Sequence, residues 1–411
     1  MDHLPDLPLA AEARLPELLA AGGPRLVDLR LVWPRLRAPR ARGGGRPAAG
    51  APPRHRGADD VGTGPCGSRG RAARAAGAGG GRDGPPDDKP LTGRRSPFDL
   101  EGRAAPGLYA AAWACTAVGL AAALVGLAAS APVTTPVLFG IGMAVFALGL
   151  GAGAGSQALQ RRADGLERYT GPSPILVFGA AVTASLAVEA LVVLVGGPAG
   201  LPEQAALVVS AATTAIAAIG AVGLLVVGSG ALSWRDMGLH RPAEADGSLV
   251  LDVIWGIALA VPTLAFAGAV AIVLVGILGV MPEPALPLTP DPVAMLVNLV
   301  VAVAVAPLWE ELFFRGFATT AWARGLGRQG AIVRGGVFFA VIHVLTISGG
   351  DFGTAARLAL IAFAARLPVG LVLGWIFLRR RSLAAPIALH ATYNALPLLL
   401  YLATQSALPT G

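Results

Sequence analysis

Nine long apolar runs follow one another from residue 106 onward, and they constrain the fold more than any other feature of the sequence. Each run is long enough to cross a hydrocarbon core of about 30 Å as a helix. Of the 411 residues, 54% are hydrophobic and only 14% are charged, against roughly 25% charged in an ordinary soluble domain. The sequence therefore predicts an all-α polytopic membrane protein with about eight or nine transmembrane helices. The expected spans are residues 108–130, 136–156, 174–196, 205–231, 250–280, 292–317, 333–348, 356–378 and 383–403.

Basic residues in the connections between the spans indicate the orientation. Arginines gather in residues 161–168, 234–241, 315–336 and 378–382. The intervening connections "GGPAGLPEQ", "MPEPALPLTPDP" and "SGGDFG" contain no Lys or Arg. Because positive connections mark the cytoplasmic side, we expect an integral, multi-pass protein with a cytoplasmic N-terminus. Because the arginines gather in the N-terminal hundred residues and in these connections, the formal charge of +7 does not require nucleic acid as a partner.

Residues 1–104 differ from the rest of the chain, because they consist largely of Arg, Gly, Pro and Ala without an aliphatic pattern. Such a segment cannot bury enough apolar surface to offset its chain entropy, so it is predicted to be disordered. A basic arm, a spacer and a wrongly assigned start codon all remain open for it. No signal peptide is expected, since no apolar core follows the start. The remainder divides into a group of transmembrane helices, residues 105–232, and a second transmembrane part, residues 233–405.

Three ionisable residues lie at the end of the sixth apolar run, in the stretch "WEELFFRG". Charges at such a depth are unfavourable unless they are paired or functional. Glu311 and Arg315 are four residues apart and share one helix face, whereas Glu310 does not. We expect Glu311 to pair with Arg315, which leaves Glu310 free to face the interior of the bundle. A carboxylate held in this way is a candidate general base.

Two histidines, His343 and His390, also lie inside predicted spans, and Asn394 shares a face with His390. At about 1.5 Å per residue, Glu310 and His390 lie roughly 10 Å from the cytoplasmic ends of their spans and His343 roughly 12–15 Å. Groups at one level on different helices can cooperate. The spacing therefore predicts a single intramembrane catalytic chamber that opens toward the cytoplasm.

Two chemistries fit such a chamber. A carboxylate and an imidazole around one water can activate it for attack on an amide carbonyl, while His390 and Asn394 supply donors for the oxyanion. Alternatively, Glu310, His343 and His390 could bind zinc, and the metal would then acidify the water. The sequence does not decide between them, so zinc is an open cofactor.

Three motifs in this order, Glu310-Glu311-x-x-x-Arg315, Phe339-x-x-x-His343 and His390-x-x-x-Asn394, resemble those of the CPBP family. This family contains the type II CAAX prenyl endopeptidases and bacteriocin-processing relatives. The resemblance extends over residues 230–400, where "SWRDMGLHR" and "PVGLVLGWIFLRRRSLAAPIALHATYN" are similar to the family's lead-in and final helices. It makes residues 233–405 a protease-like catalytic domain. The long Arg-rich N-terminus and the nine spans are departures from the family pattern.

The resemblance implies intramembrane endoproteolysis of a membrane-associated protein or peptide. In the family's terms, Glu310 and His343 activate water, Glu311 and Arg315 support the first glutamate, and His390 and Asn394 stabilise the oxyanion. A metal-free mechanism is favoured. Two alternatives remain open: a non-catalytic membrane-binding or bacteriocin-immunity protein that uses the same pocket, and a transporter, for which no inverted repeat is visible. The oligomeric state is left open.

Two further ionisable groups lie within predicted spans. Glu189 is expected to form a hydrogen bond inside the bundle rather than to line the chamber. Arg366 is expected to be a structural or interfacial residue, with a motif glutamate as the alternative partner.

Overall fold

Helices make up most of the part of the chain that the computed structural model describes. This part comprises residues 99–129, 133–166, 168–196, 201–239, 249–283, 289, 291–345 and 347–407, and within it there are no strands. Residues 88–411 form one unit. The predicted disordered segment, 1–104, lies outside the described residues apart from 99–104.

The α-helices alternate with three π-helical segments, which are labelled η. Their bounds are α1 Pro106–Ala129, α2 Thr134–Ala163, α3 Pro174–Gly196, α4 Glu203–Ala221, η2 Val222–Val227, α5 Leu249–Leu278, α6 Pro292–Val300, η4 Val301–Val305, α7 Ala306–Glu311, η5 Leu312–Thr319, α8 Thr320–Ile342, α9 Phe352–Arg380 and α10 Ala384–Ala407. Eight helices of the described residues are long and apolar enough to cross a membrane. The predicted all-α polytopic membrane fold is therefore confirmed.

The sixth and seventh expected spans, 292–317 and 333–348, fall within the run Pro292–Ile342, which is counted as one of the eight although Gly327 divides it into two helices. Gly327 interrupts this run with a φ of 76° and a ψ of 173°, which is not helical geometry. Only glycine adopts such a conformation without strain. The seventh span also ends earlier than expected, since α8 stops at Ile342 and His343 caps its C-terminus.

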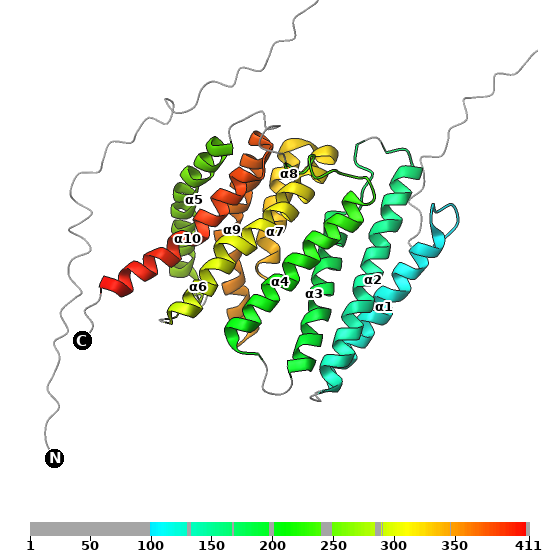
Figure 1. Cartoon of the computed structure of the whole chain (residues 1–411), viewed down its shortest axis with the longest axis horizontal. Coiled ribbons are helices and arrows are strands. Elements are labelled where there is room, and N and C mark those ends of the chain that lie inside the picture. The colour runs from blue at the N-terminus through cyan, green and yellow to red at the C-terminus, as the bar shows by residue number, and fades with distance from the viewer. Residues whose placement is uncertain are drawn as a thin grey trace, which may run out of the picture. The chain divides into compact units, whose positions relative to one another are not determined.

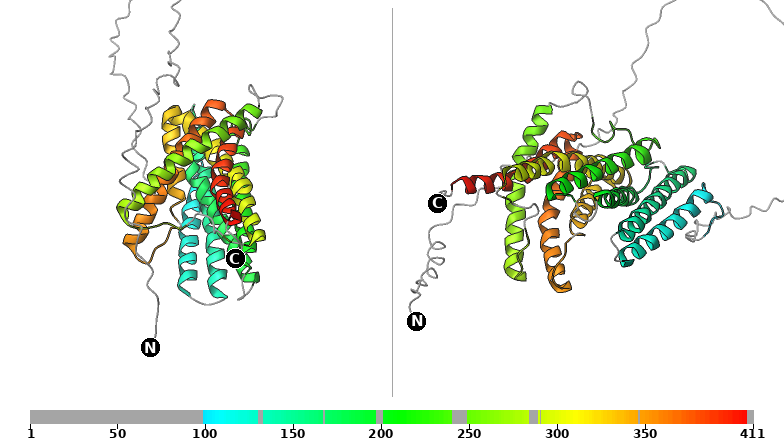
Figure 2. Two further views of the ribbon diagram at one scale, coloured as in Figure 1. Left: turned by 90° about the vertical axis from the view of Figure 1, so that its left-hand side faces the viewer. Right: turned by 60° about the horizontal axis from the view of Figure 1, so that its bottom comes forward.

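Small residues bring α1 and α2 together at one edge of the unit, as Figures 1 and 2 show. A Cβ added at Gly119 would lie 2.4 Å from the backbone nitrogen of Phe146, and one at Gly142 would lie 2.4 Å from that of Ala123. Only residues without a side chain permit this approach, which is typical of helix pairs within membranes. From this pair, α2 contacts α3 and α3 contacts α4.

The other helices pack around α9 and α10. Here α5 contacts both α9 and α10, and α8 contacts α9. Gly256 of α5 lies against α10, since a Cβ on it would meet the carbonyl oxygen of Ala385 at 2.4 Å. Gly370 of α9 lies against α8, where its Cβ would be 2.9 Å from the carbonyl oxygen of Gly336. These two contacts set the distance between α5 and α10 and the distance between α8 and α9.

Three of the four Arg-containing connections meet at one end of the unit. Arg324 forms an ion pair of 2.8 Å with Asp236. Arg328 donates to the carbonyl oxygen of Leu378 at 3.0 Å, and the Gly238 carbonyl accepts from the Leu383 backbone at 3.2 Å. Gly238 has a φ of 84°, which favours glycine at this turn. The fourth connection joins them because Arg162, at the end of α2, donates to the carbonyl oxygen of Ser229. The four Arg-containing connections that the sequence placed on one side of the membrane thus lie at one end of the bundle.

An aromatic cluster joins the N-terminal helices to those that carry the motifs. Phe178 of α3 packs edge-on against Phe313 of η5 and Phe338 of α8, with ring centroids 5.5 and 5.4 Å apart. Phe314 contacts Phe339 at 5.3 Å. The two transmembrane parts proposed from sequence therefore share one core, which places α3 directly behind the motif residues.

Candidate active site

The paired glutamates lie on a short α-helix between two π-helical segments. Helix α7 ends at Glu311, η4 precedes it and η5 follows it. Thr319 donates its hydroxyl to the Phe314 carbonyl five residues earlier, at 2.8 Å. π-helical turns are rare and frequently occur at functional sites, because the extra residue per turn changes the direction of the side chains.

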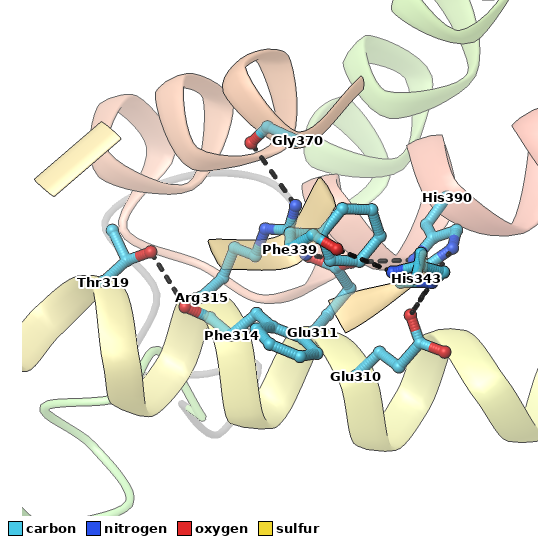
Figure 3. A network of polar contacts seen from close by, with 9 residues as sticks. All are labelled: Glu310, Glu311, Phe314, Arg315, Thr319, Phe339, His343, Gly370 and His390. Carbon is cyan, nitrogen blue, oxygen red and sulfur yellow. Dashed lines mark hydrogen bonds and ion pairs between the residues drawn. The ribbon is translucent and has the colours of Figure 1, made fainter. Parts of the chain in front are cut away.

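A buried ionic network surrounds Glu311. Its Oε1 accepts from Arg315 Nη1 at 2.9 Å and from His390 Nδ1 at 2.8 Å. The side chains of Glu311 and Arg315 are 0% and 1% exposed. Arg315 also donates to the Gly370 carbonyl at 3.3 Å and lies over the ring of Phe339 at 4.3 Å. Figure 3 shows this network joining η5, α9 and α10. Glu311 therefore orients His390, a role different from the support of Glu310 that the resemblance implied.

Glu310 points away from this ion pair and toward the two histidines (Figure 3). Its Oε2 lies 3.7 Å from His343 Nε2 and 4.0 Å from His390 Nε2. Both distances exceed a hydrogen bond. Within the described part of the chain, Glu310 Oε2 is a buried atom without a hydrogen-bond partner. Such atoms are uncommon in native structures and are associated with catalytic roles.

The contact at Nδ1 determines the tautomer of His343. His343 Nδ1 lies 2.7 Å from the Phe339 carbonyl oxygen, which can only accept. Nδ1 therefore carries the hydrogen, and in the neutral ring Nε2 has a free lone pair that faces Glu310. The Phe339 ring also packs on the imidazole, with centroids 4.3 Å apart. The end of α8 thus presents a hydrogen-bond acceptor to the carboxylate.

Asn394 has a different partner from the one expected. Its Nδ2 donates to the carbonyl oxygen of Ala302, in η4, at 2.8 Å. Ala302 belongs to the π-helical segment in which regular α-helical bonding is lost. Asn394 thus ties α10 to the segment before the glutamates.

The metal alternative finds no support in the geometry. Among the residues that the structure describes, no group of three or more His, Cys, Asp or Glu side chains is arranged to hold a metal ion. Glu310, His343 and His390 are near one another but do not form such a group.

The two additional ionisable groups have different surroundings. Glu189 Oε1 accepts from the hydroxyls of Ser185, Ser210 and Thr213, at 3.0, 3.1 and 3.3 Å, and so joins α3 to α4. This is the hydrogen bonding inside the bundle that the sequence predicted. Arg366 donates to the Ala362 carbonyl at 3.3 Å and interacts electrostatically with Glu310.

The comparison with known families applies to the segment that carries these groups. Residues 292–396 match the family model of the Rce1-like type II CAAX prenyl endopeptidases. This segment is a CPBP-type domain. It contains all seven motif residues, from Glu310 to Asn394, and the resemblance drawn from the sequence is thereby confirmed. The match supports an intramembrane endopeptidase of the CAAX type. No curated protein and no solved structure matches the chain.

The sequence did not predict the backbone carbonyl groups that accept hydrogen bonds from the motif side chains. The carbonyls of Gly370, Phe339 and Ala302 hold Arg315, His343 and Asn394, respectively. Because every residue has a carbonyl, a sequence gives no signal for such partners. The glycines at 336 and 370 were the available sign of close helix packing at this level.

Proposed function

We propose that the chain is an intramembrane endopeptidase in which Glu310 and His343 activate the attacking water. The observation that carries this proposal is the buried Glu310 Oε2, with His343 Nε2 at 3.7 Å and His390 Nε2 at 4.0 Å. These separations are too long for direct hydrogen bonds but suit one water that bonds to the carboxylate and an imidazole together.

The water is oriented by two acceptors. One hydrogen points to Glu310 Oε2 and the other to His343 Nε2, whose tautomer makes it an acceptor. The lone pair of the water is then directed at the substrate carbonyl. During attack a carbon–oxygen bond forms and the first hydrogen moves to Glu310, which acts as the general base.

The oxyanion that results lies near His390. With its Nδ1 held by Glu311, the His390 ring is oriented so that Nε2 faces the reacting atoms and can stabilise the oxyanion. When the carbon–nitrogen bond breaks, the proton on Glu310 passes to the leaving amine. Asn394 then acts as a positioning residue, since its amide holds η4 rather than the reacting atoms.

The substrate class is a membrane-associated protein or peptide, in accordance with the family match. The chamber faces the cytoplasm in this proposal. The positive-inside pattern supports that orientation, because Arg-containing connections meet at one end of the unit.

The test is a comparison of peptide termini in membranes of cells that make the wild type, Glu310→Gln or Glu203→Gln at matched levels. Glu203 is an exposed carboxylate in the first turn of α4 and serves as the matched control. Loss of the base lowers the rate by about 10²–10⁴-fold. We expect termini that depend on the protein in the wild type and in Glu203→Gln, and not in Glu310→Gln.

Two results would count against the proposal. Equal termini with Glu310→Gln would remove Glu310 as the base. If none of the three proteins changes the termini, although each is folded in the membrane, the non-catalytic binding or immunity role replaces proteolysis.

A further inference from the structure

A separate cavity of about 570 Å³ lies where α2 ends, α3 begins and α8 starts. It is lined by Arg161, Gly165, Leu166, Arg168, Tyr169, Ser173, Pro174, Ala321, Trp322, Gly325, Leu326 and Arg334. None of these residues belongs to the three motifs. The cavity reaches the surface, because Arg168 and Arg334 are exposed.

Positive charge dominates the lining. It contains three arginines, and none of the described lining residues is Asp or Glu. Arg161 donates to the Gly171 carbonyl at 2.5 Å, and Arg334 lies 5.7 Å from the ring of Trp322. Within the part of the chain that the structure describes, these contacts are to neutral groups, so an anion in the cavity would be favoured.

The start of α3 adds to this preference. Ser173 and Pro174 line the cavity, and Pro174 is the first residue of the 23-residue helix α3. The N-terminus of a long helix carries a partial positive charge, which favours an anion. Only this dipole contributes here, because the Ser173 N–H already donates to Gln157 Oε1 at 2.6 Å and Pro174 has no N–H. Tyr169 is not a free donor either, because its hydroxyl bonds to the Pro172 carbonyl at 2.9 Å.

The position of the cavity identifies the source of the anion. Helices α2 and α3 are each apolar and long enough to span a membrane, and α8 belongs to the run Pro292–Ile342, which is also a candidate span. The cavity lies where α2 ends and α3 begins, beside the first residues of α8. This is the level of the lipid headgroups. Trp322 fits this level, since tryptophan is enriched there, and Leu166 and Leu326 give the cavity an apolar part. Basic pockets between transmembrane helices are suited to anionic lipid headgroups.

We propose that this cavity binds the phosphate group of an anionic phospholipid of the surrounding membrane. The three arginines bind the phosphate oxygens, with the start of α3 beside them. Trp322, Leu166 and Leu326 contact the glycerol and upper acyl region. This proposal does not depend on the proteolytic function, because no lining residue takes part in the chemistry at Glu310.

The test is a titration of the purified full chain, in a non-ionic detergent, with dioleoylphosphatidylglycerol, with dioleoylphosphatidylcholine, and with inorganic phosphate as competitor. Native mass spectrometry counts the bound lipids. The variant is Arg168→Gln with Arg334→Gln, both exposed positions in the lining. The control is Arg324→Gln with Arg328→Gln, which removes two charges from the same end but outside the lining.

We expect one phosphatidylglycerol per chain, bound more tightly than phosphatidylcholine. Each basic residue near a lipid contributes about 1 kcal/mol, so loss of two corresponds to a fall in affinity of roughly 30-fold. The control should bind as the wild type does. The proposal is overturned if both double variants lose affinity equally, if phosphatidylcholine binds as well, or if inorganic phosphate displaces the lipid at equal concentration. Thermal unfolding of each protein verifies that the variants are folded.

Discussion

Replacement of Glu311 by Gln perturbs the most deeply buried ion pair of the domain while it preserves the shape of the side chain. In the wild type the carboxylate accepts from Arg315 at 2.9 Å and from His390 at 2.8 Å. Both charged partners of the pair are essentially inaccessible, at 0% and 1% exposure. The amide would leave the guanidinium of Arg315 without a compensating charge.

The expected loss of stability follows from this burial. Removal of one partner from a buried ion pair lowers the free energy of unfolding by about 3–5 kcal/mol. This is a large part of the total stability of an ordinary domain, which is about 5–15 kcal/mol. The Gly370 carbonyl, 3.3 Å from Arg315 Nη2, remains as a weak partner and places the estimate toward the lower end of that range. A loss of about 3 kcal/mol corresponds to a fall in Tm of roughly 6–12 °C.

A double-mutant cycle with Arg315→Met separates the ion pair from other effects. The methionine removes the charge that Glu311→Gln leaves unpaired, so the double variant should be more stable than the sum of the two single losses predicts. We expect a coupling of about 1–3 kcal/mol. The assay is thermal unfolding of the detergent-solubilised full chain, followed by tryptophan fluorescence. Losses below about 1 kcal/mol that simply add would refute the buried pair as a stabilising feature.

Three other predictions follow from the geometry. Gly370→Ala should destabilise the chain by about 1–3 kcal/mol and reduce activity, because its Cβ would lie 2.9 Å from the Gly336 carbonyl oxygen. Gly276→Ala is the control and should be neutral, since its Cβ would meet nothing within 4 Å. Equal unfolding midpoints for the two variants would contradict this prediction. The backbone N–H of Ser233, together with Arg324, holds the pKa of Asp236 below its ordinary value near 3.8, so its contribution to stability is present above that value and lost as the pH falls through the folded pKa. Asp236→Asn should therefore flatten the acid end of the stability profile, and identical profiles for the two proteins would refute the interaction. Exhaustive chelation should leave proteolysis unchanged, while stoichiometric zinc that disappears in His343→Ala, together with loss of activity on chelation, would establish the metal mechanism.

Hydropathy and charge pattern were sufficient for the membrane fold. The apolar run at 250–280 became α5, Leu249–Leu278, and that at 174–196 became α3, Pro174–Gly196. This succeeds because a spanning segment must satisfy its own backbone groups, so length and apolarity leave the helix as the only local structure. The expected boundary between the sixth and seventh spans contains Gly327, whose non-helical φ and ψ divide the run Pro292–Ile342 into two helices.

The pairing of Glu311 with Arg315 and the direction of Glu310 followed from the helical spacing alone. The partners of those groups did not. The Asn394 amide donates to the Ala302 carbonyl, a contact that its spacing to His390 did not predict. That carbonyl is available because the Ala306 N–H bonds to Val301 and Pro307, five residues after Ala302, has no N–H. Asp252 is likewise buried and paired with Arg380 at 2.5 Å, 128 residues further along, a contact that the sequence does not indicate.

The charges at the end of an apolar run have an explanation in these contacts. Within the described part of the chain, Glu311, Arg315 and His390 neutralise and hydrogen-bond one another, which offsets much of the unfavourable free energy of their burial. Glu310 is treated differently, since its Oε2 remains buried with two imidazoles beyond hydrogen-bond distance. A fold selected only for stability would replace such a carboxylate by an apolar residue or pair it as Glu311 is paired. The Oε2 of Glu311 is also buried without a hydrogen-bond partner, but Glu311 is held through Oε1 by Arg315 and His390, whereas the two imidazoles nearest Glu310 Oε2 lie beyond hydrogen-bond distance. The proposed reacting water at Glu310 accounts for this difference and makes Glu310→Gln the substitution expected to remove activity while it spares, or even raises, the stability.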